Sequence, residues 1–204
     1  MKIFNGEKIV RRSFIKYLVE GAVIIGCLKF VSTVASSSNE PVRPPGSVEE
    51  KYFNLLCVRC GICLQVCPTG AVVLSGFEYG AQAANTPIIN PIYGPCEFYR
   101  GRCEEEMRCS RHCPTGALRQ IDRGEVKLGT IHLNKEYCLA HRGLECMVCA
   151  EICPVPGAIT IQDRKPIFNK DGCVGCGACL YACPADPKPL HLTSEGARRL
   201  KWLV

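Results

Sequence analysis

Sixteen of the seventeen cysteines fall into four groups of four, and a proline follows the last cysteine of every group. In chain order the groups are Cys57, Cys60, Cys63 and Cys67; Cys96, Cys103, Cys109 and Cys113; Cys138, Cys146, Cys149 and Cys153; and Cys173, Cys176, Cys179 and Cys183. Only Cys27 lies outside them. Whatever fold the chain adopts must bring these sulfur atoms together in sets.

The spacing within the groups separates the explanations for so many cysteines. A disulfide joins sulfurs in pairs and needs Cβ atoms within roughly 4.5 Å of each other. Cysteines packed as closely in the sequence as Cys57 to Cys67 are poor disulfide partners, but their thiolates can converge on one centre. The first and fourth groups match the C-x2-C-x2-C-x3-C-P run of bacterial [4Fe–4S] ferredoxins. A structural zinc site would use two well-separated pairs instead. We therefore expect all sixteen grouped cysteines to ligate [4Fe–4S] clusters, four clusters in all.

Short apolar stretches follow three of the four prolines. They are TGAVVL from Thr69, TGALRQ from Thr115 and PGAITI from Pro156, and each predicts a turn that leads into a short strand. A proline does not continue a helix, because it has no N–H to donate. We expect an α+β, ferredoxin-like fold of two pseudo-symmetric lobes that each hold two clusters. So small a core implies that metal ligation supplies much of the folding energy.

The net charge of +6 does not indicate a nucleic-acid partner. Residues 1–35 carry six Lys or Arg against two acidic residues, so most of the excess belongs to the N-terminal segment. Thiolate-bound clusters would make the remainder net negative. The sequence has no basic stripe with interleaved aromatic residues, so we exclude nucleic-acid binding.

The N-terminal segment has the features of an export leader. Arg11 and Arg12 precede an aromatic residue and an apolar stretch, which is typical of a twin-arginine signal. Two charged residues interrupt that stretch, whereas a spanning helix needs about twenty apolar residues. We expect a signal peptide over residues 1–35 that is cleaved after Ala35, with lipidation of Cys27 as the alternative. The protein is then periplasmic, exported folded by the twin-arginine route, with membrane association left open. Folding before export would protect the thiols from oxidation.

Two further regions follow the leader. Residues 36–50 are polar and rich in proline, which predicts a linker without a core of its own. Residues 51–204 form the expected four-cluster region. Its motifs lie near residues 57–68, 96–114, 138–154 and 173–184.

The chain resembles a known family at RPPG from Arg43 and in the CVRCGICLQVCP that follows. The likeness extends through NTPIINPIYGPC, HCPTGAL, CLAHRGLECMVCAEICP and GCVGCGACLYACP, and it covers nearly the whole chain. These motifs resemble the NapG/MauM family, the ferredoxin-type proteins of periplasmic nitrate-reductase and methylamine-utilisation gene clusters. The resemblance implies an exported carrier of four [4Fe–4S] clusters. It also implies transfer of electrons from a membrane-bound quinol-oxidising iron–sulfur protein to a periplasmic redox enzyme, a reductase such as nitrate reductase or a dehydrogenase.

The second group departs from the family pattern, which resembles C-x2-C-x4-C-x3-C-P. Tyr99 stands where the second cysteine is expected, Cys103 follows four residues later, and the acidic residues 104–106 precede Cys109. Either a looser and more acidic site changes the integrity and potential of its cluster, or Cys103 compensates as an ordinary ligand. We favour compensation.

No residue pattern indicates catalysis. The sequence has no dinucleotide-binding fingerprint after a strand and no nucleophile elbow, and its four histidines are scattered. We therefore expect an electron carrier without a substrate of its own rather than an enzyme. The alternative is a fixed iron–sulfur subunit of a larger molybdenum-type oxidoreductase.

The groups must also pair, because in two-cluster ferredoxins the fourth cysteine of one run ligates the other cluster. If neighbours pair, Cys67 exchanges with Cys113, and Cys153 with Cys183. If the pairing is nested, as in the iron–sulfur subunits of molybdenum enzymes, Cys67 exchanges with Cys183, and Cys113 with Cys153. Short connections favour neighbours, whereas the two regular runs lie first and last, which favours nesting. We expect nesting.

Overall fold

The computed structural model describes residues 15, 17, 19–23, 25, 26, 29, 40–103 and 105–202. The expected export motif at Arg11 and Arg12, the cleavage position after Ala35, and Cys27 all lie outside these residues. Within the described part of the chain, no helix combines the length and the apolar character needed to cross a membrane.

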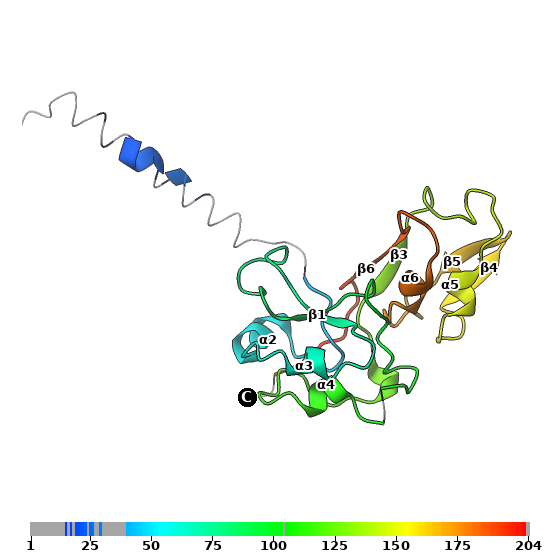
Figure 1. Ribbon diagram of the computed structural model, residues 1–204, viewed down its shortest axis with the longest axis horizontal. Helices are drawn as coiled ribbons and strands as arrows, with labels where there is room; N and C mark the ends of the chain where they lie inside the picture. The colour runs from blue at the N-terminus through cyan, green and yellow to red at the C-terminus, as the bar shows by residue number, and fades with distance from the viewer. Residues whose placement is uncertain are drawn as a thin grey trace, which may run out of the picture.

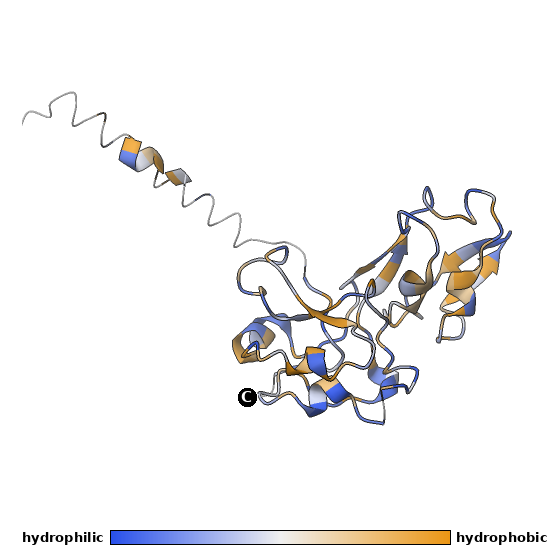
Figure 2. Ribbon diagram, viewed as in Figure 1, coloured by the Kyte–Doolittle hydropathy of each residue, from blue (hydrophilic) through white to orange (hydrophobic). Residues whose placement is uncertain are grey.

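Residues 40–128, the first half of the folded region, surround one hydrophobic core (Figure 1). The elements are the helices α2 (Glu50–Leu56), α3 (Ile62–Gln65) and α4 (Arg108–Arg111), the strands β1 (Val72–Leu74) and β2 (Pro87–Ile89), and the 3-10 turn η1 (Arg123–Glu125). β1 and β2 pair antiparallel with Val72 opposite Ile89, and both side chains are buried. Figure 2 shows that β1 is hydrophobic along its length. Phe53, Met107 and Leu118 complete the centre of this core.

Residues 129–193, the second half, surround a smaller core. The elements are the strands β3 (Thr130–Leu133), β4 (Ile159–Gln162), β5 (Lys165–Phe168) and β6 (Leu190–Thr193), and the helices α5 (Val148–Glu151) and α6 (Ala178–Ala182). β3 pairs antiparallel with β6, and β4 with β5. Ile131, Leu180 and Leu190 bring β3, α6 and β6 together in the core (Figure 1). Short helices and short antiparallel pairs in both halves confirm the expected α+β class.

The helices next to the cysteines are single turns. α3, α4 and α5 have four residues each and α6 has five. Gly61 and Gly177 begin α3 and α6 in the left-handed conformation, with φ of 75° and 79°, which glycine adopts without strain. Isolated helices this short are not stable in water. They therefore depend on packing and on what their cysteines bind.

Two of the three predicted strands after the prolines are confirmed. TGAVVL contains β1 and PGAITI contains the start of β4. The prediction for TGALRQ is wrong, since Leu118 makes only an isolated bridge to Ser47. The physical reason lies in the partner segment, because Pro44 and Pro45 precede Ser47 and have no N–H with which to extend a ladder.

The prediction of a linker over residues 36–50 is wrong over the described residues. Residues 41–48 are buried in the first half. Arg43 is fully buried, its Nε donates to Glu50 Oε2 at 2.9 Å, and its guanidinium lies 4.4 Å from the centre of the Phe53 ring. The prolines keep this segment out of helices and sheets. The apolar side chains of the segment and the guanidinium of Arg43 still pack and form hydrogen bonds in the first half. A proline-rich composition therefore indicated missing regular structure, not missing contacts.

The C-terminal residues return to the first half. Leu200 forms a parallel bridge with Val48. The Trp202 ring stacks against Tyr52, with 6.5 Å between ring centres, and the Arg119 guanidinium lies 4.5 Å from the Trp202 ring centre. Residues 200–202 therefore pack against α2 and the segment that enters it.

Candidate metal centres

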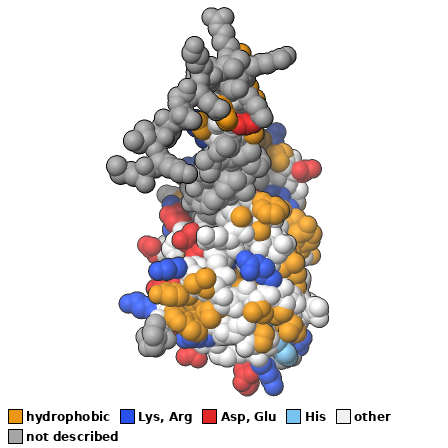
Figure 3. All heavy atoms as spheres, turned by 90° about the vertical axis from the view of Figure 1, so that its left-hand side faces the viewer, with side chains coloured by type: hydrophobic (Ala, Val, Ile, Leu, Met, Phe, Trp, Pro, Cys, Tyr) orange, Lys and Arg blue, Asp and Glu red, His pale blue; other side chains and the backbone are white. Residues whose placement is uncertain are grey.

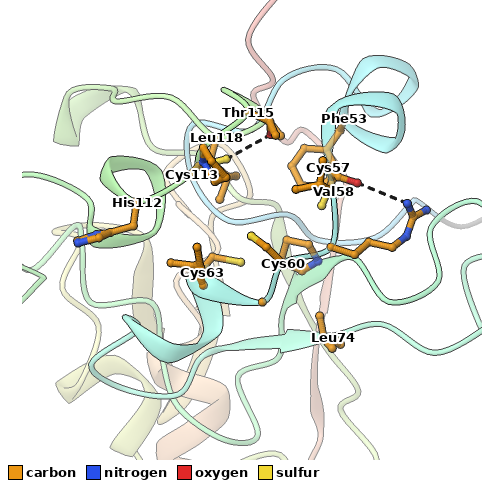
Figure 4. Close-up of a pocket in the computed structure, with 16 residues that line it drawn as sticks. Phe53, Cys57, Val58, Cys60, Cys63, Leu74, His112, Cys113, Thr115 and Leu118 are labelled. Carbon is orange, nitrogen blue, oxygen red and sulfur yellow. Dashed lines mark hydrogen bonds between the residues drawn. The ribbon is translucent and has the colours of Figure 1, made fainter.

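The first site lies between α3 and the segments that follow α2 and α4. Four cysteines line its cavity, namely Cys57, Cys60, Cys63 and Cys113. Figure 4 shows their side chains around one space, with Phe53 and Leu118 at its edge. The fourth thiol therefore comes from the second cysteine group and not from the first.

The electrostatics of this site favour a bound cation. Burial, followed by the neighbouring thiolates of Cys57 and Cys60, raises the pKa of Cys63 to about 12. Burial alone would also raise the pKa of Cys113, but hydrogen bonds from the backbone of Leu118 and from Thr115 lower it below its ordinary value. Thr115 Oγ1 lies 3.7 Å from Cys113 Sγ (Figure 4). Four thiolates can share this space only if positive charge lies among them. Binding of a cationic metal centre must therefore displace the protons of the cysteine thiols.

The second site lies behind β1 and β2. The cysteines that line its cavity are Cys67, Cys96, Cys103 and Cys109. The shell around them is mainly apolar, with Val72, Ile89 and Met107 among the lining residues, but it also includes the buried carboxylate of Glu97. Burial raises the pKa of Cys96 to about 12 and that of Cys109 well above the ordinary thiol value.

Cys103 lies in the second site, although the unusual spacing of its group had left its role as a ligand open. It is buried and lines the cavity, whereas Tyr99 packs against the first core. Of the three acidic residues before Cys109, Glu104 lies outside the described residues. Glu105 and Glu106 are exposed, and neither lines the cavity. This placement agrees with Cys103 as a compensating ligand.

The third and fourth sites lie in the second half and repeat the same arrangement. The third is lined by Cys153, Cys173, Cys176 and Cys179. The fourth is lined by Cys138, Cys146, Cys149 and Cys183. Ile131 and Phe168 border the third site, and Leu133 and Leu190 border the fourth. Burial is the main cause that raises the pKa of Cys176 and of Cys149, each to about 11.

All four sites join three cysteines of one group to the last cysteine of its sequence neighbour. The nested pairing is therefore wrong, because Cys113 and not Cys183 lies beside Cys57. The physical reason is that α3 packs against α4 and α5 packs against α6, which places consecutive groups side by side. The regular spacing of the first and last groups reflects the shape of their own loops and carries no information about their partners.

The donor set and its surroundings fit a [4Fe–4S] cluster. No disulfide joins the sixteen grouped cysteines. The thiols of each set surround a space lined mainly by apolar side chains instead of meeting at one point. Among the described residues, no three Cys, His, Asp or Glu side chains are arranged to hold a single metal ion. Four thiolates around an apolar space are the ligands that such a cluster takes.

Polar side chains beside the thiols complete two of the sites. Thr69 Oγ1 lies 3.7 Å from Cys67 Sγ and donates to the Pro95 carbonyl at 2.8 Å, just as Thr115 approaches Cys113. Sequence reasoning missed both threonines, although the repeated Cys-Pro-Thr-Gly could have indicated them. His112 lies at the edge of the first site, but its Nδ1 is 2.9 Å from the Arg108 carbonyl, and in Figure 4 the ring points away from the cysteines.

Comparison with known proteins agrees with this geometry. Residues 51–73 match the family model of a 4Fe-4S binding domain, and residues 143–186 match that of a 4Fe-4S dicluster domain. The methylamine utilization ferredoxin-type protein MauM of Paracoccus denitrificans is 32% identical, covering 87% of this chain and 88% of MauM. MauM of Methylobacillus flagellatus is 34% identical, covering 94% and 89% of the two chains. The ferredoxin-type protein NapG of Escherichia coli is 33% identical, covering 85% and 80%.

The relatives and the cysteine sites lead to the same family. Identities above 30% extend over most of both chains, and the matched 4Fe-4S domains contain cysteines that line the cavities. The chain therefore belongs to the MauM/NapG family of ferredoxin-type proteins, which are iron–sulfur proteins of electron transfer.

Proposed function

We propose that this protein is a periplasmic electron carrier with four [4Fe–4S] clusters, two in each half. It relays electrons between a membrane-bound quinol-oxidising iron–sulfur protein and a periplasmic redox enzyme, a reductase such as nitrate reductase or a dehydrogenase. The observation that supports this most directly is the set of four cavities, each lined by four thiols in a largely apolar shell. A bound cluster takes up and releases one electron at a time.

The residues around the sites serve to hold the clusters and to exclude water. The apolar side chains that border each cavity lower the local polarity, which together with hydrogen bonds to sulfur sets the potential of such a site. Thr69 and Thr115 place hydroxyl groups beside the sulfurs of Cys67 and Cys113. Two side chains of the acid–base type line these cavities, Glu97 in the second and His112 in the first. Glu97 is paired with two arginines and His112 Nδ1 lies 2.9 Å from the Arg108 carbonyl, so structural contacts occupy both, which supports a carrier rather than an enzyme.

The first site reaches the surface, where a redox partner can approach. Cys60 is exposed, Val58 of the same site is 62% exposed, and Leu55 near the end of α2 is 78% exposed. Arg59 and Lys51 place positive charge beside this apolar surface. Figure 3 shows hydrophobic side chains among scattered basic and acidic side chains on the face of the molecule that includes α2. An apolar patch of this kind is a common contact surface for another protein.

Cross-linking in intact cells tests the proposed function. A photo-activated cross-linker at position 58, beside the first site, should capture a redox protein of the membrane or the periplasm. The same group at Asp163, which is exposed at the turn between β4 and β5, serves as the control position. Stable, stoichiometric isolation with a molybdenum catalytic chain would favour the fixed-subunit alternative. Capture of proteins without redox groups at position 58, or the same captures at both positions, would contradict the proposal.

A further inference from the structure

The loop between Cys96 and Cys103 contacts the third site in the other half of the molecule. The backbone N–H of Cys96, a cysteine of the second site, donates to the carbonyl of Cys176 in the third site, with N and O 2.8 Å apart. Nearby, the backbone N–H of Leu128 donates to the Val174 carbonyl at 2.9 Å. The cysteine loop of the third site is therefore hydrogen-bonded directly to the first half.

Gly177 allows this close approach between the halves, and Gly175 allows a second one within the second half, where the loop of the third site passes Gly129. A Cβ atom on Gly175 would lie 2.7 Å from the backbone N and O of Gly129, and one on Gly177 would lie 2.4 Å from Pro91 Cβ. Gly61 occupies the same position in the first cysteine group with a similar φ, yet a Cβ there would meet nothing within 4 Å. The difference shows that close packing, and not only the turn, requires glycine at 177. The contact between the halves is a closely packed junction.

Arg100 crosses this junction. Its Nη2 donates to the backbone carbonyl of Ile152, the residue before Cys153. Its Nη1 lies 3.5 Å from Glu97 Oε1, and its side chain is only 18% exposed. Cys153, which follows Ile152 directly, lines the third cavity, and the Cys176 carbonyl of the same site accepts the hydrogen bond from Cys96 at the start of the Arg100 loop. The guanidinium is thus held at the residue next to a cysteine of a site to which its own loop contributes none.

We propose that Arg100 is a positioning residue of the third site, which clamps the second-group loop onto Ile152 and places a permanent positive charge beside that site's thiolates. The inference rests on the proposed function, because it requires an iron–sulfur cluster in the third site. A neighbouring positive charge stabilises the more negative, reduced form of a cluster, so Arg100 raises the midpoint potential of this site. On reduction the site gains one electron, no bond forms or breaks, and Arg100 keeps its proton, because guanidinium is always charged in proteins.

The same loop supplies the counter-charge and a matched control. The Glu97 side chain is 5% exposed, and its other oxygen, Oε2, lies 3.7 Å from Arg102 Nε. Two arginines against one carboxylate leave the loop with a net positive charge. Arg102 is 73% exposed, so its charge is screened by water while that of Arg100 is not. Replacing either arginine changes the net charge equally, but only Arg100 bonds to Ile152.

The experiment compares Arg100→Gln, Arg102→Gln and Arg100→Lys in the full-length protein prepared without oxygen. Iron and acid-labile sulfide are counted first. Midpoint potentials are then measured by titration with dithionite, followed by electron paramagnetic resonance. We expect Arg100→Gln to lower the potential of one centre, Arg102→Gln to leave all potentials unchanged, and Arg100→Lys to retain most of the wild-type value. Cys173→Ser should alter the spectrum of the same centre, which identifies it as the third site.

The possible failures are distinguishable. Absence of iron from the wild-type protein contradicts the proposed function itself. Full iron content with equal potentials in Arg100→Gln and Arg102→Gln contradicts only the role of Arg100. The role of Arg100 is also contradicted if Arg100→Gln shifts the potential of a centre whose spectrum Cys173→Ser leaves unaltered, because that centre is not the third site. If Arg100→Gln fails to fold, Arg100→Lys decides, because a Lys variant with full iron and a much lower third-site potential excludes the charge as the cause.

Discussion

Replacing Cys57 and Cys113 together with Ala should remove about four irons per chain, whereas replacing Cys57 and Cys67 together should remove about eight. The first two cysteines are 56 positions apart but line one cavity. The second two belong to one run of the sequence but line different cavities. Loss of one ligand already destroys a site, so a second loss from the same site costs little more.

Iron and acid-labile sulfide counts on the anoxically prepared variants measure this effect. The control is the pair Cys57→Ala and Cys183→Ala, which the structure places in two sites in different halves, so that about eight irons should be lost. If this pair loses about four irons and the pair with Cys113 loses about eight, the pairing of sequence neighbours is contradicted. The nested arrangement would then hold.

Replacing Arg11 and Arg12 together with Lys should leave a folded, cluster-bearing protein in the cytoplasm, with almost none in the periplasm. The expectation follows from the twin-arginine motif and from assembly of the sites on reduced thiols before export. Cell fractionation and immunoblotting, with iron measured in the cytoplasmic fraction, provide the readout.

A charge-conserving control separates the motif from the general charge of the leader. Replacing Lys2 and Lys8 together with Arg makes the reverse exchange outside the RRSFIK stretch, with the charge again conserved, and should leave export unchanged. Normal periplasmic accumulation of the protein with Lys at positions 11 and 12 would show that a different route is used.

The local spacing of cysteines was sufficient to predict their chemistry but not their partners. Ligands three or four residues apart belong to one loop, so a run such as Cys57, Cys60 and Cys63 necessarily faces one centre. The fourth ligand comes from a loop that approaches through tertiary packing. Nothing within either group records that α3 packs against α4. The expectation of nesting relied on the similar cysteine spacing of the first and last groups. Similar spacing does not show that two groups lie in contact.

The proline-rich segment and the Arg100 loop were beyond sequence reasoning for a similar reason. Arg43 follows a polar, linker-like stretch. Only the folded chain shows that its side chain donates a hydrogen bond to Glu50 and lies over the ring of Phe53. Arg100 lies in the loop whose spacing departs from the family, where sequence alone raised a doubt about Cys103. The structure places Cys103 in the cavity of the second site and Arg100 beside the third site.

The central claim is that the chain holds four [4Fe–4S] clusters, and its most direct test is the metal content of the purified protein. Purified and kept without oxygen, the protein should contain about sixteen iron and about sixteen acid-labile sulfide per chain. A preparation that contained only zinc, or whose cysteines were all in disulfides, would contradict the claim.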